Sequence, residues 1–166
     1  MGRQRPASVT NALRAQWALV AVGAVSTLLT VVMREDLLRA WADSNSAARA
    51  IVAEGGLVAL EQSAISIPAF APVAVVSFIV YACLAWVIAV LFREGHAWAR
   101  WSLLALAAAL LFAALVVYRA DPPMPFMVLG VLAVALDLVL VWFLLQRDSG
   151  EWVRGATLAE EHEQIG

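Results

Sequence analysis

Residues 124–145 of the chain read MPFMVLGVLAVALDLVLVWFLL, a run that contains one charged side chain. An α-helix rises 1.5 Å per residue, so roughly 20 residues are needed to cross the hydrocarbon core of a bilayer. The apolar residues of this run do not alternate with a period of two, which argues against a strand of a barrel. Because the bilayer interior offers no water to unpaired backbone groups, we predict that this run is a membrane-spanning helix.

Three earlier runs have the same character, and they cover residues 15–33, 69–92 and 97–118. The first is longer than the apolar core of a signal peptide and no small-residue cleavage site follows it, so we expect it to be retained. The polar links at residues 93–96 and 120–123 are short, which makes the last three spans antiparallel neighbours. The sequence therefore predicts an all-α fold, a four-helix transmembrane bundle over residues 15–146.

The overall composition agrees with a chain that lies in lipid. Hydrophobic residues make up 63% of it and charged residues 14%, whereas soluble domains have roughly 45–50% and 25%. A soluble protein could not cover so much apolar surface, so we expect the lipid bilayer to be the main partner. The net charge of −2 gives no reason to expect nucleic acid. The single cysteine, Cys83, excludes an internal disulfide and a cysteine-based zinc site within one chain.

The connection between the first two spans, residues 34–68, is much longer than the others. Its first part, residues 34–53, carries apolar side chains at largely helical spacing with charged residues between them. This pattern indicates an extra amphipathic helix in the external loop, which either lies on the membrane surface or caps the bundle. Gly55 and Gly56 are predicted to end this helix.

The placement of the arginines predicts the orientation. One side of the membrane would carry residues 1–14, the link at 93–100 and the tail at 147–166, and it holds seven of the eleven basic residues, all of them arginine. Cytoplasmic loops carry the excess of basic residues, so we expect both termini in the cytoplasm and the chain in the plasma (inner) membrane. The cytoplasmic tail is polar, and it becomes acidic at residues 160–163.

Asp137 lies near the middle of the last span, with apolar neighbours on both sides. An acidic residue at this depth costs roughly 2.5–3.5 kcal/mol on insertion scales, so we predict that Asp137 faces the bundle or a partner subunit as an intramembrane polar site. One interpretation is a carboxylate that handles protons or cations. The other is a protonated or hydrogen-bonded carboxyl that holds helices together, for which the span hydroxyls are candidate partners: Ser26, Thr27, Thr30, Ser77, Tyr81 and Ser102.

Two further sets of residues are candidates for contacts in or beside the membrane. Basic and aromatic side chains around the second link are placed to anchor the third span at the lipid headgroups: Arg93, Trp98, Arg100 and Trp101. A docking site for a cytoplasmic partner is the alternative for this set. Alanines spaced by four on the third span form a small-residue stripe suited to helix packing: Ala105, Ala109 and Ala113.

Two short motifs lie at the ends of the spans. Residues 93–101 read REGHAWARW and residues 146–154 read QRDSGEWVR. The first resembles a feature of small four-span membrane proteins from actinobacteria, in which basic–x–Gly–x–x–Trp–Ala–Arg joins spans two and three. The second is similar to that family's Ser–x–x–Trp–x–Arg ending. The resemblance implies the four-span layout and no activity, and Asp137 is not part of its pattern.

The sequence lacks the groups of residues that catalysis requires. It contains no nucleophile–base pair, phosphate loop or dinucleotide fingerprint, and two isolated histidines, His96 and His162, do not make a metal site. We therefore expect no enzyme, no cofactor and no bound metal. The leading hypothesis is an accessory or structural subunit, or a modulator, whose partners are other membrane subunits or a second copy. The alternative is a small oligomeric transporter or channel that is coupled to protons or cations through Asp137.

Overall fold

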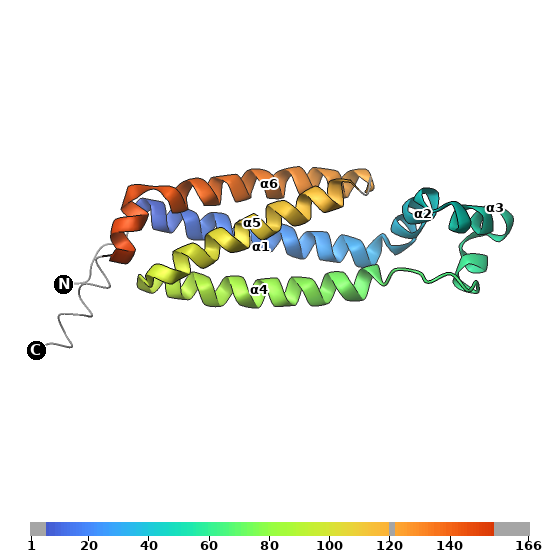
Figure 1. Cartoon of the computed structure of the whole chain (residues 1–166), viewed down its shortest axis with the longest axis horizontal. Helices are drawn as coiled ribbons and strands as arrows, with labels where there is room; N and C mark the ends of the chain where they lie inside the picture. The colour runs from blue at the N-terminus through green and yellow to red at the C-terminus, as the bar shows by residue number, and fades with distance from the viewer. Residues whose placement is uncertain (1–5, 120–121, 155–166) are drawn as a thin grey trace, which may run out of the picture.

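The structure is a computed structural model that describes residues 6–119 and 122–154. These residues form an all-α molecule in which four helices are long and apolar enough to cross a membrane (Figure 1). The four helices are α1 (Ala7–Val32), α4 (Phe70–Glu94), α5 (Ala97–Tyr118) and α6 (Met124–Leu145). The predicted fold class, a four-helix bundle with extra helical structure between the first two spans, is confirmed.

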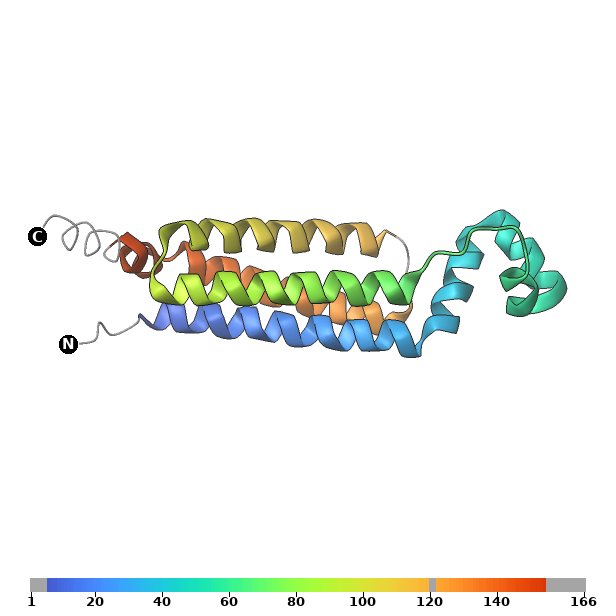
Figure 2. The ribbon, with the colours of Figure 1, turned by 90° about the horizontal axis from the view of Figure 1, so that it is seen from below.

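The four long helices form a ring of antiparallel neighbours. α1 packs against α4 and α6, and α5 packs against the same two helices, so α1 and α5 lie diagonally opposite. The most extensive contact joins α1 and α6, the first and last spans. Figures 1 and 2 show the spans side by side with alternating directions, and the described ends of the chain lie at one end of the bundle. We call this the termini end and the opposite one the insert end.

Gly95 makes the tight link between α4 and α5. Its φ is 100°, in the left-handed region that glycine adopts without steric cost. The N–H of Gly95 donates to the carbonyl of Phe92, and the N–H of His96 donates to the carbonyl of Leu91, each at 3.1 Å. These two bonds satisfy carbonyls in the last turn of α4, and the sharp reversal predicted at residues 93–96 is confirmed.

The first helix is longer than the apolar run that predicts it. α1 begins at Ala7, whereas the predicted span begins at residue 15. Ser8, Val9 and Ala12, in the extra turns, are buried. Hydropathy detects only the part of a helix that hydrocarbon surrounds, and these turns are held instead by packing against the end of the bundle.

The segment after the last span is also helical. Residues 147–154 belong to the predicted polar tail, yet they continue as helix after a break at residue 146. Trp152 and Val153 from this segment are buried in the same core cluster as the spans. This part of the tail is therefore packed on the termini end, and the acidic stretch at 160–163 lies outside the described residues.

The core of the bundle occupies only the half next to the termini end. The buried residues of the spans lie between residues 8 and 19 in α1, 85 and 92 in α4, 99 and 107 in α5, and 137 and 144 in α6. In the described part of the other half, no span residue is buried. Asp137 is the buried residue of α6 that lies farthest from the termini end, so it sits at the inner limit of the core.

The insert between the first two spans forms a small helical unit of its own. It contains α2 (Arg34–Ser44) and α3 (Ser46–Glu61), which project beyond the bundle in Figures 1 and 2. Ala42, Ala48 and Leu60 form a separate buried cluster inside it. Residues 34–53 are helical as predicted, but they belong to two helices and not to one. The two helices pack against each other, so the chain reverses direction within the insert.

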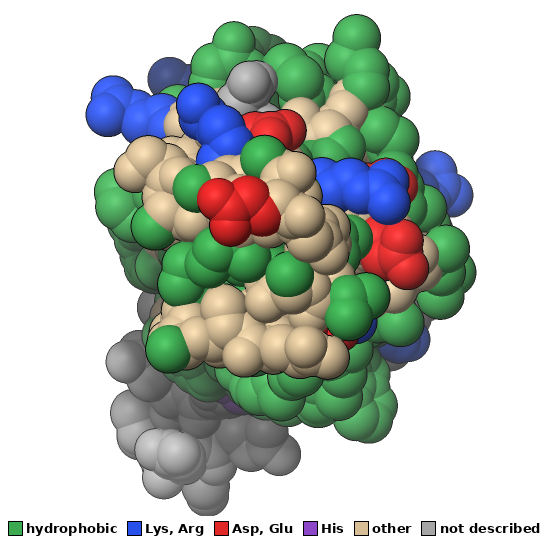
Figure 3. Space-filling model, turned by 90° about the vertical axis from the view of Figure 1, so that its right-hand side faces the viewer, with side chains coloured by type: hydrophobic (Ala, Val, Ile, Leu, Met, Phe, Trp, Pro, Cys, Tyr) green, Lys and Arg blue, Asp and Glu red, His purple; other side chains and the backbone are tan. Residues whose placement is uncertain are grey.

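Two residues set the shape of the insert. Asn45 ends α2 and caps α3, since its side-chain oxygen accepts hydrogen bonds from the N–H groups of Ala47 and Ala48 at 3.1 and 3.3 Å. Gly56 has a φ of 70° and interrupts α3, so the predicted break at Gly55 and Gly56 is found at the second glycine, although helix resumes after it. Figure 3, a view onto this end of the molecule, shows acidic and basic side chains close together on its surface.

Candidate functional site

Asp137 lies inside the bundle and has no hydrogen-bond partner among the described residues. Its exposed fraction is 1%, and both carboxyl oxygens are buried. It lies eight residues before the end of α6, which at 1.5 Å per residue places it roughly 12 Å from the termini end of that helix. Two directions were predicted for this side chain, the bundle or a partner subunit, and in the structure it faces the bundle.

Tyr81 is the polar residue that interacts with Asp137, and Gln16 is in turn bonded to Tyr81. Gln16 comes from α1 with an exposed fraction of 1%, and its Nε2 donates a hydrogen bond to the Tyr81 hydroxyl oxygen at 3.0 Å. Tyr81 comes from α4 and lies close enough to Asp137 for their charges to interact. Three different spans thus bring one carboxyl, one hydroxyl and one carboxamide together at the inner limit of the core. We call these three residues the polar cluster.

Most of the other predicted hydroxyl partners of Asp137 are engaged elsewhere or face outward. Thr27 and Thr30 each donate to the carbonyl four residues earlier in α1, both at 2.9 Å. The Ser77 side chain is exposed on α4. Of the six predicted partners, Tyr81 is the one that interacts electrostatically with Asp137 among the described residues. A direct hydrogen bond from a helix hydroxyl to Asp137 is not present in the described part of the chain.

Gln16 was missed by the sequence analysis. It stands at the second position of the predicted span 15–33, where a polar residue is naturally assigned to the lipid headgroups. Because α1 begins at Ala7, Gln16 lies in the third turn of the helix, on the side that faces the core. A polar residue within an apolar run was the available signal.

A second polar contact holds the termini end together. The Arg100 side chain, predicted to anchor at lipid headgroups, donates from Nε to the carbonyl of Leu144 at 2.7 Å. This carbonyl belongs to the last turn of α6, where no further backbone donor continues the helix. The Ser149 hydroxyl donates to the carbonyl of Phe143 at 2.8 Å and lies 3.0 Å from the hydroxyl of Ser8. The end of α6 is therefore tied both to α5 and to α1.

The two sequence motifs meet at this contact. A Cβ atom at Gly150 would lie 2.9 Å from a guanidinium nitrogen of Arg100, so glycine permits the close approach of the second motif to the first. Two residues further on, Trp152 is buried in the same core cluster as the spans. Segments about 50 residues apart in sequence thus form one structural unit, and the sequence analysis, which treated the motifs separately, did not foresee it.

The remaining anchor residues stay on the surface. Trp98 and Trp101 are exposed at the start of α5, as is Arg93 at the end of α4. The Arg100 guanidinium lies 5.9 Å from the centre of the Trp101 ring, within the range of a cation–π contact. These positions suit contact with headgroups at the membrane boundary, and that contact stays a prediction.

The alanine stripe lies on the outside of the bundle. Ala105, Ala109 and Ala113 are all exposed on α5, whereas Ala99 and Ala107 are the alanines that α5 buries. The stripe therefore does not pack against another span of this chain. Its predicted role in helix packing stays a prediction that would require another chain.

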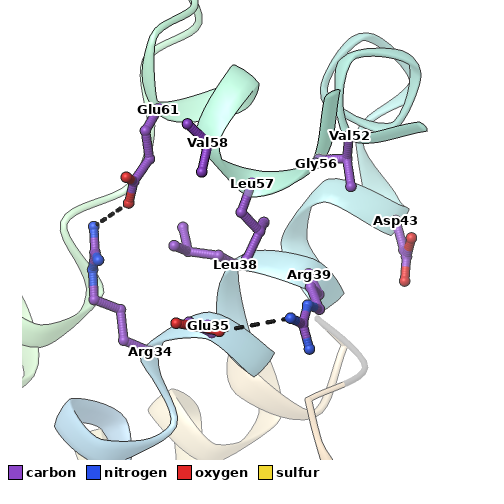
Figure 4. A pocket seen from close by; sticks show the side chains of 10 residues that line it. All are labelled: Arg34, Glu35, Leu38, Arg39, Asp43, Val52, Gly56, Leu57, Val58 and Glu61. Atoms are coloured by element: carbon purple, nitrogen blue, oxygen red, sulfur yellow. Dashed lines mark hydrogen bonds and ion pairs between the residues drawn. The ribbon is translucent and has the colours of Figure 1, made fainter. Parts of the chain in front are cut away.

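The insert carries an open pocket of about 540 Å³ between α2 and α3 (Figure 4). Arg34 forms an ion pair with Glu61 at 2.9 Å across one side of it, and Arg39 is paired with Glu35 at 3.6 Å on another. These side chains are exposed, and such surface pairs contribute roughly 0–1 kcal/mol each. Both arginines that line the pocket are paired with carboxylates of the chain, so they do not point to an anionic ligand.

No group of three or more His, Cys, Asp or Glu side chains that could hold a metal is found among the described residues. His96 lies 3.1 Å from the carbonyl of Leu91 and 3.9 Å from a carboxylate oxygen of Glu94, which accounts for its ring as part of the link. His162 lies outside the described residues.

Comparison with known protein families, characterised proteins and solved structures finds no match to this chain. The resemblance to small actinobacterial four-span proteins therefore stays a prediction. The fold defines the class of protein: an integral membrane protein with four helical spans, whose spans contact the lipid bilayer.

Proposed function

We propose that the chain is a non-catalytic accessory subunit that packs beside other spans in a larger membrane complex. The observation that carries this proposal is the uneven packing of the bundle, which buries span residues only in the half next to the termini end. Helices associate in lipid through close van der Waals packing and interhelical hydrogen bonds, because apolar side chains gain little by leaving lipid for protein. A half that makes little such packing within the chain is available to make it with another.

The exposed alanine stripe gives this proposal a specific face. Small side chains allow two helix backbones to approach closely, and Ala105, Ala109 and Ala113 present such a surface outward from α5. The α2–α3 unit offers a second surface beyond the membrane, with charged groups of both signs. An actinobacterial origin, which the motifs suggest, is compatible with this role and does not specify the partner.

Purification in mild detergent tests the proposal. The wild-type chain is expected to co-purify with a membrane subunit or with a second copy, in a complex of defined mass. Ala109→Leu places a larger side chain in the middle of the stripe and is expected to reduce the recovered complex at least tenfold. Ala135→Leu makes the same change at an exposed position of α6 and should leave it intact. A wild-type chain that is monomeric and alone would refute the accessory role.

A second function is favoured by Asp137. A buried carboxyl at mid-span is the kind of residue that marks proton and ion pathways in membrane proteins. As a small oligomeric transporter or channel, the protein would show proton- or cation-dependent flux in proteoliposomes, and Asp137→Asn would abolish it. Absence of flux in the wild type would remove this candidate.

We also propose that the termini end faces the cytoplasm. The start of α1, the α4–α5 link and the end of α6 lie at this end (Figure 2), and they belong to the segments that hold seven of the eleven arginines. A reporter that is active only in the cytoplasm, fused to the C-terminus, is expected to be active. The same reporter placed within the insert should be inactive, and the reverse pattern would overturn the orientation.

A further inference from the structure

We propose that Asp137 is a proton-binding site enclosed within the bundle, with Tyr81 and Gln16 as its polar wall. The ligand is one proton, which forms an O–H bond with one carboxyl oxygen and leaves the side chain neutral. The proposal does not rest on the accessory role. It deepens the second candidate function by naming the ion that the buried carboxyl holds.

The carboxyl group of Asp137 is enclosed by the bundle. Both oxygens of Asp137 are buried, and no described residue donates a hydrogen bond to either of them. The side chain points into the bundle from α6, and its two neighbours in the polar cluster come from α1 and α4. A cation from another subunit would have to pass between packed helices to reach it. The carboxyl must therefore be accommodated by groups of this chain.

The described side chains around Asp137 carry no positive charge that could balance a carboxylate. α1 contributes the carboxamide of Gln16, which is neutral, and α4 contributes Tyr81, the one other titratable side chain of the polar cluster. α5, the other neighbour of α6, buries Leu103 and Ala107. Its cation, Arg100, is bonded at the last turn of α6 instead. Among the described residues, no positive charge balances an ionised Asp137.

The two protonation states of Asp137 differ in what they require of their surroundings. An ionised carboxylate in a low-dielectric interior is strongly unfavourable unless a cation or several donors compensate it. The neutral acid carries no such penalty, and it has one O–H donor and one free carbonyl oxygen. The surroundings of Asp137 therefore match the protonated side chain and not the ionised one.

The Tyr81 hydroxyl is the remaining hydrogen-bond donor of the polar wall. The Tyr81 oxygen already accepts from Gln16 Nε2, so the hydroxyl hydrogen is the group that Tyr81 can offer to Asp137. Gln16 acts as a positioning residue, because it orients Tyr81 and does not donate a hydrogen bond to the Asp137 carboxyl.

Infrared spectroscopy of the full chain in lipid vesicles at neutral pH tests the proposal. The wild-type protein is expected to show the C=O stretching band of a protonated carboxylic acid, and the band should shift when aspartate is isotope-labelled. Asp137→Asn should lose the band. Asp43→Asn, at an exposed position of α2, should keep it. Tyr81→Phe should keep the band at a shifted frequency, because the neighbouring hydroxyl is gone.

The outcomes are distinct. A wild-type spectrum without a label-sensitive protonated band, or a band that survives Asp137→Asn, overturns the proposal. If Asp137→Asn fails to fold, Asp137→Leu replaces it and should likewise lose the band. A band without flux in proteoliposomes keeps the site and removes the transporter, whereas flux without a band removes the site alone.

Discussion

Asp137→Leu is expected to stabilise the isolated chain, although it removes the one acidic side chain of α6. Both carboxyl oxygens are buried without a partner among the described residues. Burying such a polar group costs roughly 1–3 kcal/mol in protein mutational data. Leucine keeps the branching at Cγ and removes the polar atoms, so the free energy of unfolding should rise by about this amount, less any strain from the larger methyl groups.

Gln16→Leu is the matched control, and it should have the opposite sign. Gln16 is as deeply buried as Asp137, but its Nε2 bonds to Tyr81 at 3.0 Å. Its loss removes a hydrogen bond that contributes roughly 0.5–1.5 kcal/mol and leaves the Tyr81 oxygen without that donor. Two substitutions of the same chemical kind within one polar cluster are therefore predicted to change the stability in opposite directions.

Thermal unfolding in a mild detergent, followed by circular dichroism, measures both effects. Each kcal/mol corresponds to about 2–4 °C in Tm for a chain of this size. Asp137→Leu should therefore melt above the wild type and Gln16→Leu below it. If Asp137→Leu lowers the Tm as much as Gln16→Leu does, Asp137 makes stabilising contacts and the reasoning from its unpaired oxygens is refuted.

Three other predictions address the rest of the molecule. Trp152→Ala removes a large buried side chain, so we expect a loss of roughly 3–5 kcal/mol and faster tryptic cleavage within residues 147–154, and unchanged cleavage would show that this helix is not held by Trp152. Arg100→Ala removes a charged donor from a carbonyl at the end of α6 and should lower stability by about 1.5 kcal/mol, the low end for such bonds because the side chain is only partly buried. Arg93→Ala, at an exposed arginine of the same link, should leave the Tm within about 1 °C, and equal effects of both changes would contradict the capping role. Asn45→Ala should weaken the insert by about 1 kcal/mol and speed amide hydrogen exchange at the start of α3, and exchange at the wild-type rate would mean that the cap does not matter.

The contact between the two motifs gives a structural reason for their presence together. Arg100 of the first motif and Gly150 of the second lie against each other where α5 meets the end of α6. A glycine leaves room for the guanidinium, and the guanidinium satisfies a carbonyl that the helix end leaves open. We therefore interpret the two motifs as a structural contact that holds the helices together at the termini end of the bundle. This role needs no ligand.

Several features of the insert and links could be predicted from local sequence. The short link at residues 93–96 was expected to make two spans antiparallel neighbours, and Gly95 forms it with a positive φ. Asn45 was not singled out, although an Asn before an alanine-rich segment is a recognised helix-start signal. The apolar spacing over residues 34–53 indicated helix correctly, but it could not tell one rod from two helices that share a small core.

The amino-acid sequence by itself determined the four spans, their helical conformation and the antiparallel order of the last three. These properties follow from the length and apolarity of single segments and from the shortness of the links, and both are local. The rest depended on which side of each helix meets another helix. Only the tertiary structure decided that Tyr81 interacts with Asp137 and bonds to Gln16, that Arg100 binds the end of α6 and that the alanine stripe faces outward. In helices that are hydrophobic all round, the sequence carries little signal for the buried face, so the packing of neighbouring spans selects it.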